Sequence, residues 1–363
     1  MTPRRVRESL GSALLIVLSV TAVQAQQEVR VGVLGLFHPK QLVLEQSGAQ
    51  VIAVAGREGA WVLNGEPGHR RMLFQADVDQ VLIEGSVRIP QEGGDAARRT
   101  LTSWTATARG GGAVAFQLTI PGQITRRYEG TLTILARNGE LLAVVAMDRE
   151  TAVASIVAAE LMPQSPMEAL KAQAVVTRSF LEAGGRHKEY EFCDTTHCQF
   201  LRSPPDRKSK VWHAVADTRG MVLEYRGKPL AAMYSSRCGG QTHSLQQVGM
   251  RPGSGYPYYP ATCPYCRRHS LQWETHIGDS DRPPETGNEG SRILQARQWG
   301  WSAVPGSDFT ATRVNSGWLL EGHSIGHGIG MCQFGAAGMA ASGMIFRDIL
   351  RQFYPNTEIV TLP

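Results

Sequence analysis

Residues 131–147 read TLTILARNGELLAVVAM, and this stretch decides which fold class the chain can adopt. Apolar residues alternate with polar ones before Asn138-Gly139 and continue after it, which is typical of two short strands. Asn-Gly favours the positive backbone angles of a type I′ turn, so the stretch predicts a β-hairpin. A helix is expected directly after it, beginning in the Asp148–Glu150 cluster, ending near Leu161 and largely buried on both faces.

A second helix is predicted after a break at Pro163. Ser165 can cap it, Pro166 suits its first position, and Glu168 completes a capping box. The glycine pair at 184–185 ends it. We therefore expect Glu160 to lie at an elbow between two helices.

The chain on either side of this centre differs in character. Before the hairpin, residues 26–125 show turn signals and strand patterns with few helix signals. We expect an α+β fold, with a β-rich N-terminal part (26–125) followed by a mixed α/β catalytic domain with a groove (126–363). Expected strands lie near 28–36, 80–89, 113–120, 220–225 and 229–235, with a hairpin at 50–64, a long loop at 251–290 and short helices at 332–341 and 345–353.

The N-terminus has the layout of a secretory signal peptide. Arg4, Arg5 and Arg7 precede an apolar run at 13–23, and small residues follow, with cleavage expected after Ala25. The alternative is a membrane anchor, but the run is shorter than the roughly 20 apolar residues that span a bilayer. The sequence therefore predicts an exported, periplasmic or extracellular protein with no membrane span after cleavage.

Composition favours a packed globule with anionic partners. Apolar residues make up 42% and charged residues 19% of the chain, and the net charge is +5. In an exported protein, a mild basic excess suits lipid headgroups or acidic wall polymers. No run of Lys and Arg is interleaved with aromatic residues, so nucleic acid is not an expected partner.

Cysteine and histidine gather in one short segment. His187, Cys193, His197 and Cys198 lie within 12 residues and match the Cys₂His₂ composition of structural zinc sites. Two alternatives stay open: Cys193 and Cys198 could form a disulfide, as an oxidising compartment permits, and His187 could be a surface residue.

A second cysteine motif, Cys263-Pro264-Tyr265-Cys266, has the spacing of redox-active pairs. It follows a loop rich in proline and tyrosine instead of a buried strand, so thiol–disulfide catalysis is disfavoured. We expect this pair to staple the loop, either with Cys238 or in a second metal site with His269.

Three blocks of sequence resemble one known family. They are Glu160–Pro163 continuing through Glu168–Val175, then Cys193–Gln199, and then Gly326–Ala336. Tyr234–Ser236 followed by Gly239–Thr242 forms a weaker fourth block. Together they resemble the stage II sporulation protein D (amidase-enhancer) family over residues 130–357, in the family's order.

The resemblance implies a lytic transglycosylase that cleaves glycan strands of peptidoglycan. The family's catalytic glutamate lies eight residues before the Glu of its Glu-Ala-Leu-Lys motif, which here is Glu168, and this position is Glu160. The resemblance also supports zinc at the His187 segment. Other members are enhancers of an amidase, which leaves a non-catalytic wall-binding role open. Many members carry Ser where this chain has Cys332.

The chemistry around Glu160 agrees with this role. Ile156, Val157 and Ala159 precede it, and the C-terminal end of a helix dipole disfavours an anion, so both effects would keep it protonated. The alternative is a solvated glutamate at a helix end. No second carboxylate stands out, which favours a mechanism with a single acid.

Substrate contacts are expected from the same blocks. His327 and Gln333 could bind sugar hydroxyl or N-acetyl groups, or pack structurally, and Arg178 could meet a wall carboxylate or pair with Glu182. The candidate substrate-binding residues are Lys171, Gln173, Arg178, Tyr234, Ser235, Ser236, His327 and Gln333.

Overall fold

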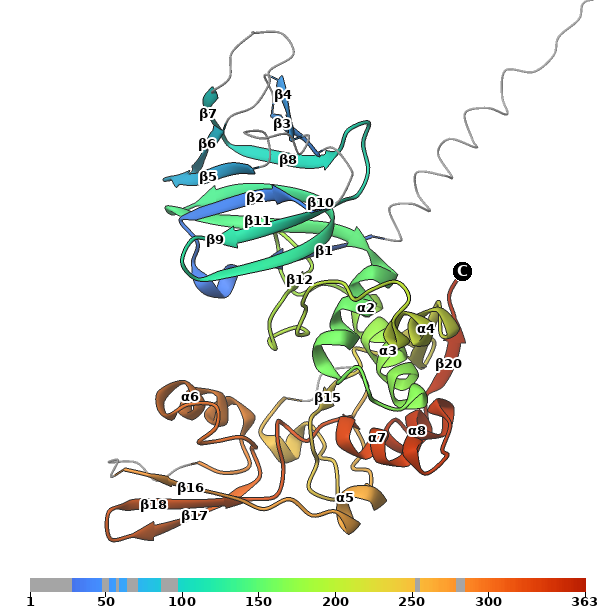
Figure 1. Cartoon of the computed structure of the whole chain (residues 1–363). Helices are drawn as coiled ribbons and strands as arrows, with labels where there is room; N and C mark the ends of the chain where they lie inside the picture. Colours follow the sequence, from blue (N-terminus) through green and yellow to red (C-terminus); the bar gives the residue numbers. More distant parts are fainter. Residues whose placement is uncertain are drawn as a thin grey trace, which may run out of the picture. The chain divides into compact units, whose positions relative to one another are not determined.

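The computed structural model describes residues 28–47, 52–56, 59–63, 71–85, 97–251, 255–278 and 285–363. The chain divides into two compact units, unit 1 (residues 1–152 and 186–198) and unit 2 (residues 153–185 and 199–363). Strands dominate unit 1, and unit 2 mixes helices with short strands, so the fold is α+β with a β-rich N-terminal part (Figure 1). The predicted signal peptide lies outside the described residues.

Unit 1 is a branched antiparallel sheet with one short parallel strand. Its main path runs β12-β1-β11-β10-β9-β2-β5-β6-β7, and β8, β3 and β4 branch from β10. The strands expected at 28–36, 80–89 and 113–120 and the hairpin at 50–64 are present. Bounds are β1 Glu28–Val33, β2 Gln41–Gln46, β3 Ile52–Gly56, β4 Gly59–Leu63, β5 Arg71–Asp77, β6 Gln80–Gly85, β7 Ala97–Leu101, β8 Ser103–Ala108, β9 Val114–Ile120, β10 Ile124–Arg137, β11 Glu140–Asp148 and β12 Phe192–Cys193.

The predicted hairpin is β10–β11. Asn138 has a φ of 51° and Gly139 a φ of 79°, the pair of positive angles that a type I′ turn requires. The first half of β10 pairs with β9 and the second half with β11 and β8. At the change of partner, a Cβ on Gly130 would lie 2.3 Å from the Ala146 carbonyl oxygen, so glycine permits the junction. The domain boundary predicted near residue 125 falls inside this continuous strand.

Helix α2 (Arg149–Glu160) follows β11 directly and is buried from residue 150 to residue 157, as predicted. Helix α3 (Met167–Glu182) is also largely buried and packs in unit 2 against α4 (Lys210–Asp217), β13 (Met221–Tyr225), α7 (Gln333–Ala341) and α8 (Phe346–Phe353). Alanines on α3 permit this close packing because they extend little from the backbone.

The predicted capping box of α3 is wrong. The helix begins at Met167 after Pro166, and no side chain caps its first turn. Glu168 instead accepts a hydrogen bond of 2.8 Å from the Phe346 N–H and pairs with Lys171 at 3.1 Å. Glu168 therefore accepts from Phe346, far away in the sequence, instead of capping its own helix.

The segment 251–290, predicted as a long loop, is more ordered than expected. It contains α5 (Pro264–Arg268), β16 (Trp273–Ile277) and the start of α6 (Glu289–Trp299). The strand predicted at 229–235 is two short strands, β14 (Lys228–Pro229) and β15 (Tyr234–Ser235). The remaining strands are β17 Phe309–Val314, β18 Gly317–Gly322, β19 Met331–Cys332 and β20 Glu358–Thr361. Within the described ranges, every helix is too short or too polar to cross a membrane.

Candidate active site

Glu160 is the last residue of α2, at the elbow that the sequence predicted. Its side chain is half-buried. The Phe200 N–H donates to Oε1 at 3.1 Å, and Nε2 of Gln333 donates to Oε2 at 3.4 Å. Two segments far away in the sequence therefore orient this carboxyl group.

Burial raises the pKa of Glu160 above its ordinary value. Hydrogen bonds from Phe200, Tyr234 and Gln333 and the charge of Arg202 act in the opposite direction but do not cancel the effect of burial. A carboxyl group with a raised pKa keeps its proton at a higher pH, so Glu160 is suited to donate one. None of these four neighbours is a second carboxylate.

A network of buried amide side chains surrounds Glu160. Nε2 of Gln333 also donates to Oε1 of Gln173 at 3.3 Å, and Gln173 donates to the Thr177 hydroxyl at 3.3 Å. Gln199 donates to the Thr177 carbonyl at 3.2 Å and accepts from the Tyr234 hydroxyl at 3.2 Å. Since each of these amides is held by a further hydrogen bond, the donors around Glu160 have fixed positions.

Strand pairing brings Tyr234 to this network. In the parallel pair β15–β19, Tyr234 lies opposite Met331, two residues before Gln333. Gly330, with a φ of 69°, makes this approach possible, because a Cβ there would lie 1.9 Å from the Met233 carbonyl oxygen. Desolvation raises the pKa of Tyr234 well above its ordinary value, so its phenol remains a donor.

His327 lies in the glycine-rich segment before β19. The Ile329 N–H donates to its Nδ1 at 3.0 Å, and the ring also hydrogen-bonds the Tyr234 backbone. Desolvation lowers the pKa of His327 to about 4, so the imidazole is neutral at neutral pH. The ring thus holds its own segment against β15, which is the structural alternative left open by the sequence.

Two predicted substrate contacts lie elsewhere in unit 2. Lys171 pairs with Glu168 and Asp217, both at 3.1 Å. Arg178 is only 1% exposed and donates to the Met221 carbonyl at 2.9 Å. Their charged groups hold unit 2 together, and this arrangement corrects the expectation that they face a ligand.

The two serines after Tyr234 differ in exposure. Ser235 is 5% exposed, whereas Ser236 is exposed and its carbonyl accepts a 3.0 Å hydrogen bond from the Phe334 N–H. Of the predicted residues, Gln173, Tyr234 and Gln333 are the ones that the structure joins to Glu160 through hydrogen bonds.

Sequence reasoning missed three residues near Glu160. Phe200 donates its N–H to the carboxyl group, Gln199 holds Tyr234, and the Arg202 guanidinium lies 3.3 Å from the Phe200 ring centroid. The available signal was their position, since all three end or directly follow the Cys193–Gln199 block. The guanidinium and the ring are within the range of a cation–π contact, which holds Arg202 beside Phe200.

The predicted metal ligands of unit 1 come together. The ligand atoms of His187, Cys193, His197 and Cys198 all lie within 4.8 Å of one another. Nε2 of His187 lies 3.3 Å from Sγ of Cys198, and a hydrogen bond with Cys198 lowers the pKa of Cys193 to about 3. Cys193 and Cys198 are free thiols and form no disulfide. The donor set and its spacing fit a Cys₂His₂ zinc site.

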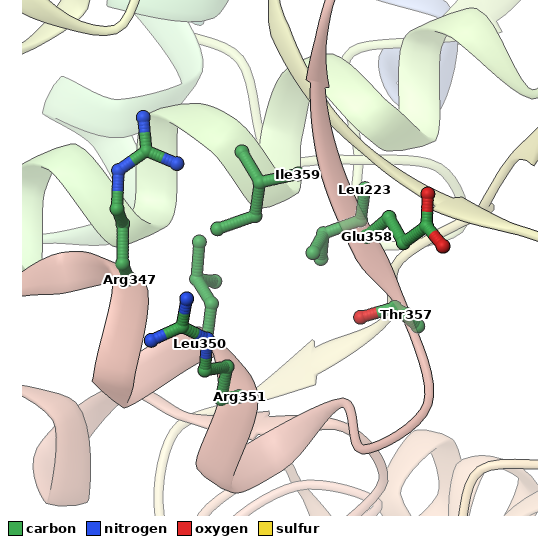
Figure 2. A pocket seen from close by; sticks show the side chains of 7 residues that line it. All are labelled: Leu223, Arg347, Leu350, Arg351, Thr357, Glu358 and Ile359. Carbon is green, nitrogen blue, oxygen red and sulfur yellow. The ribbon is translucent and has the colours of Figure 1, made fainter.

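A hollow of about 350 Å³ lies between α8 and β20, at a different place in unit 2 (Figure 2). None of its lining residues belongs to the Glu160 network, so it adds nothing to the candidate active site. They are Leu223, Arg347, Leu350, Arg351, Thr357, Glu358 and Ile359.

Comparison with known proteins matches the part of the chain that carries Glu160. Residues 137–225, which include Glu160, Gln173 and Gln199, match the family described as Stage II sporulation protein. Stage II sporulation protein D of Bacillus subtilis is 27% identical over 263 residues, covering 58% of this chain and 74% of that protein. Over this region the chain is therefore similar to the stage II sporulation protein D family.

Two further relatives extend the comparison. Stage II sporulation protein D of Bacillus amyloliquefaciens is 24% identical over 267 residues, covering 58% of this chain and 73% of that protein. An uncharacterized protein of Brachyspira hyodysenteriae is 28% identical over 268 residues, covering 64% of this chain and 72% of that protein.

Proposed function

We propose that this protein cleaves the glycan strands of peptidoglycan by a lytic transglycosylase reaction, with Glu160 as acid and then base. The observation that carries the proposal is the half-buried carboxyl group with a raised pKa, held by donors at both oxygens, while the described groups that act most on this pKa include no carboxylate. The family name supports a role in sporulation-type remodelling of the wall.

The reaction needs one acid and no water. Protonated Glu160 gives its proton to the glycosidic oxygen as the bond from the anomeric carbon to that oxygen breaks. The 6-hydroxyl of the same sugar then attacks the anomeric carbon and passes its proton to the Glu160 carboxylate. The products are a free hydroxyl on one strand and a 1,6-anhydro ring on the other, and Glu160 is protonated again.

The donors around Glu160 serve the second half of this cycle. Once the proton has left, the Phe200 N–H and the Gln333 amide stabilise the carboxylate and keep it oriented. Burial favours the acid before the transfer, and the donors limit the rise in pKa so that the carboxylate can form.

We further propose a structural zinc ion at His187, Cys193, His197 and Cys198, where it would crosslink β12 and the segments before and after it. The proposed location is outside the cytoplasm, because the N-terminal pattern is that of a signal peptide and the substrate is a wall polymer.

The test is mass spectrometry of products from purified glycan strands, with and without stem peptides, treated with wild type or Glu160→Gln. We expect anhydro-ended fragments from wild type and a rate lower by about 10²–10⁴-fold for the variant, the usual contribution of a general acid. Reducing ends would instead mean hydrolysis. If neither protein cleaves but both stimulate a separate amidase, the protein is a non-catalytic amidase enhancer.

A further inference from the structure

Four cysteines meet inside unit 2, whereas the His187 cluster belongs to unit 1. The Sγ atoms of Cys238, Cys263, Cys266 and Cys332 all lie within 4.8 Å of one another, and those of Cys266 and Cys332 are 3.5 Å apart. Cys238 is 3% exposed and the other three are fully buried. All four are free thiols.

These cysteines come from three separate segments. Cys238 follows β15, Cys263 and Cys266 lie at and inside the start of α5, and Cys332 ends β19. His269, the partner expected from the sequence, is not part of the cluster, because its ring stacks on Tyr265 with a centroid distance of 4.3 Å. The pairing of β15 with β19 and the bridge between Gln241 and Thr262 bring these segments together, so the four sulfur atoms converge in the folded chain.

The spacing of the sulfur atoms fits one metal ion with tetrahedral coordination. With Zn–S bonds of about 2.3 Å, neighbouring sulfurs in a tetrahedron lie roughly 3.7 Å apart. The 3.5 Å between Cys266 and Cys332, and the 4.8 Å limit for all pairs, bracket this value. An iron–sulfur cluster places several metal and sulfide atoms among the thiolates and therefore needs a wider cage.

The surroundings of Cys332 suit a metal-bound thiolate. The Cys238 N–H points at its sulfur at 3.4 Å and the Gly335 N–H at 3.3 Å. Backbone donors to a ligating sulfur are a common outer layer of metal sites, since they stabilise its negative charge. Without a cation, four buried thiols could not all ionise side by side.

Two glycines of α7 permit close packing around the sulfur atoms. A Cβ on Gly335 would lie 2.4 Å from Sγ of Cys263, and one on Gly338 would lie 2.3 Å from the Tyr265 ring. Helix α7 thus approaches α5 closely enough for Cys332 to join the other cysteines.

We propose that Cys238, Cys263, Cys266 and Cys332 bind a second zinc ion as a closed, structural Cys₄ site. The ion would fix the first residues of α7 to α5 and to the chain after β15. Gln333 directly follows Cys332 and donates to Glu160, so the ion would also position this donor. That last consequence rests on the proposed function, whereas the zinc site itself does not.

The test measures zinc by elemental analysis in the full chain, purified without chelator. Wild type should hold about two zinc ions per chain, and Cys193→Ser/Cys198→Ser should keep about one, since it leaves unit 2 unaltered. Adding Cys238→Ser/Cys266→Ser to that variant should remove the remaining ion. Cys266→His, which still offers four ligands, should retain the wild-type content.

Several outcomes would overturn the Cys₄ site. They are a Cys193→Ser/Cys198→Ser protein without metal, zinc that survives all four substitutions, iron in place of zinc, or a disulfide among the four cysteines in a non-reducing peptide map. If wild type holds one zinc ion and Cys193→Ser/Cys198→Ser keeps it, the Cys₄ site is supported and the zinc at His187 is refuted. None of these readouts depends on glycan cleavage.

Discussion

The two cysteine clusters of this chain differ in how they are built. The His187 cluster of unit 1 comes from residues 187–198 and is partly exposed, whereas the Cys238 cluster of unit 2 spans residues 238–332 and is buried. The first could be found by reading along the chain, whereas for the second the sequence suggested Cys238 with Cys263 and Cys266 but did not indicate Cys332, which joins them only after folding. Spacing along the sequence therefore indicates ligand sets that lie within a few residues, but it does not indicate sets assembled from distant segments.

The same contrast predicts how much each cluster contributes to stability. We expect Cys332→Ser to destabilise unit 2 by more than about 4 kcal/mol, the range reached when a buried metal site is lost. Cys193→Ser should cost less, because its cluster is partly exposed and organises a short segment. Hydrogen exchange followed by mass spectrometry, read separately for β1–β11 and for α3 and α7, measures both effects.

Each substitution should loosen only its own unit. If Cys332→Ser leaves the exchange of α3 and α7 unchanged, the buried cluster does not stabilise unit 2. Equal loosening of both units by either variant would contradict the separation of the two clusters.

Packing at the buried cluster can be tested without altering a sulfur. Gly335→Ala would place a Cβ 2.4 Å from Sγ of Cys263 and should cost about 1–3 kcal/mol through overpacking. Gly255→Ala is the matched control, because nothing lies within 4 Å of the Cβ it would add. Urea titration measures the free energy of unfolding, which should be lower for Gly335→Ala than for Gly255→Ala. Equal values would mean that the packing around Cys263 is loose.

A smaller effect on stability is expected from ionisation of Glu160. Its pKa is raised in the folded protein, so its contribution to stability is complete below the unfolded value and falls as pH rises through the folded value. Glu160→Gln should therefore gain stability relative to wild type as pH increases, by up to about 1.4 kcal/mol per pH unit between the two pKa values. Thermal unfolding from pH 4 to pH 8 measures this.

The control for that experiment lies in unit 1. Glu140→Gln removes an exposed carboxylate, which pairs with His38 at 3.0 Å, and its stability is measured over the same pH range. A parallel pH dependence in the two variants would argue against burial as the cause of the raised pKa of Glu160.

The smallest expected effect concerns Gln333. Gln333→Ala removes a donor that lowers the pKa of Glu160, so this pKa should rise further. The alkaline limb of the pH–rate profile should then move to higher pH by the same amount, provided that Glu160 is the acid. A shift to lower pH would mean that Gln333 does not act on the protonation of Glu160.

Much of the fold follows from local patterns. The hairpin of β10 and β11, the buried helix α2 and the helices α7 and α8 were all predicted, because alternation, helical spacing and Asn-Gly turn chemistry act within a few residues. The position of Glu160 at an elbow was also predicted, because Pro163 interrupts the helix just after it.

Errors arose where a distant partner replaced a local one. Glu168 does not cap its own helix because the Phe346 N–H reaches it, and Arg178 turns inward to the Met221 carbonyl. Helix α5, predicted as loop, brings two cysteines to the buried cluster. Short elements of this kind carry weak propensity and form because tertiary contacts hold them.

The sequence alone therefore determined many of the elements, the position of Glu160 at an elbow and the grouping of the local His and Cys side chains, since these depend on residues close together in the chain. Only the tertiary structure decided that Gln333, Gln173 and Phe200 surround Glu160 and that Cys332 joins Cys238, Cys263 and Cys266. The physical reason is that these contacts depend on the parallel pairing of β15 with β19 and on glycine-permitted approaches of the backbone, which no local pattern in the sequence specifies.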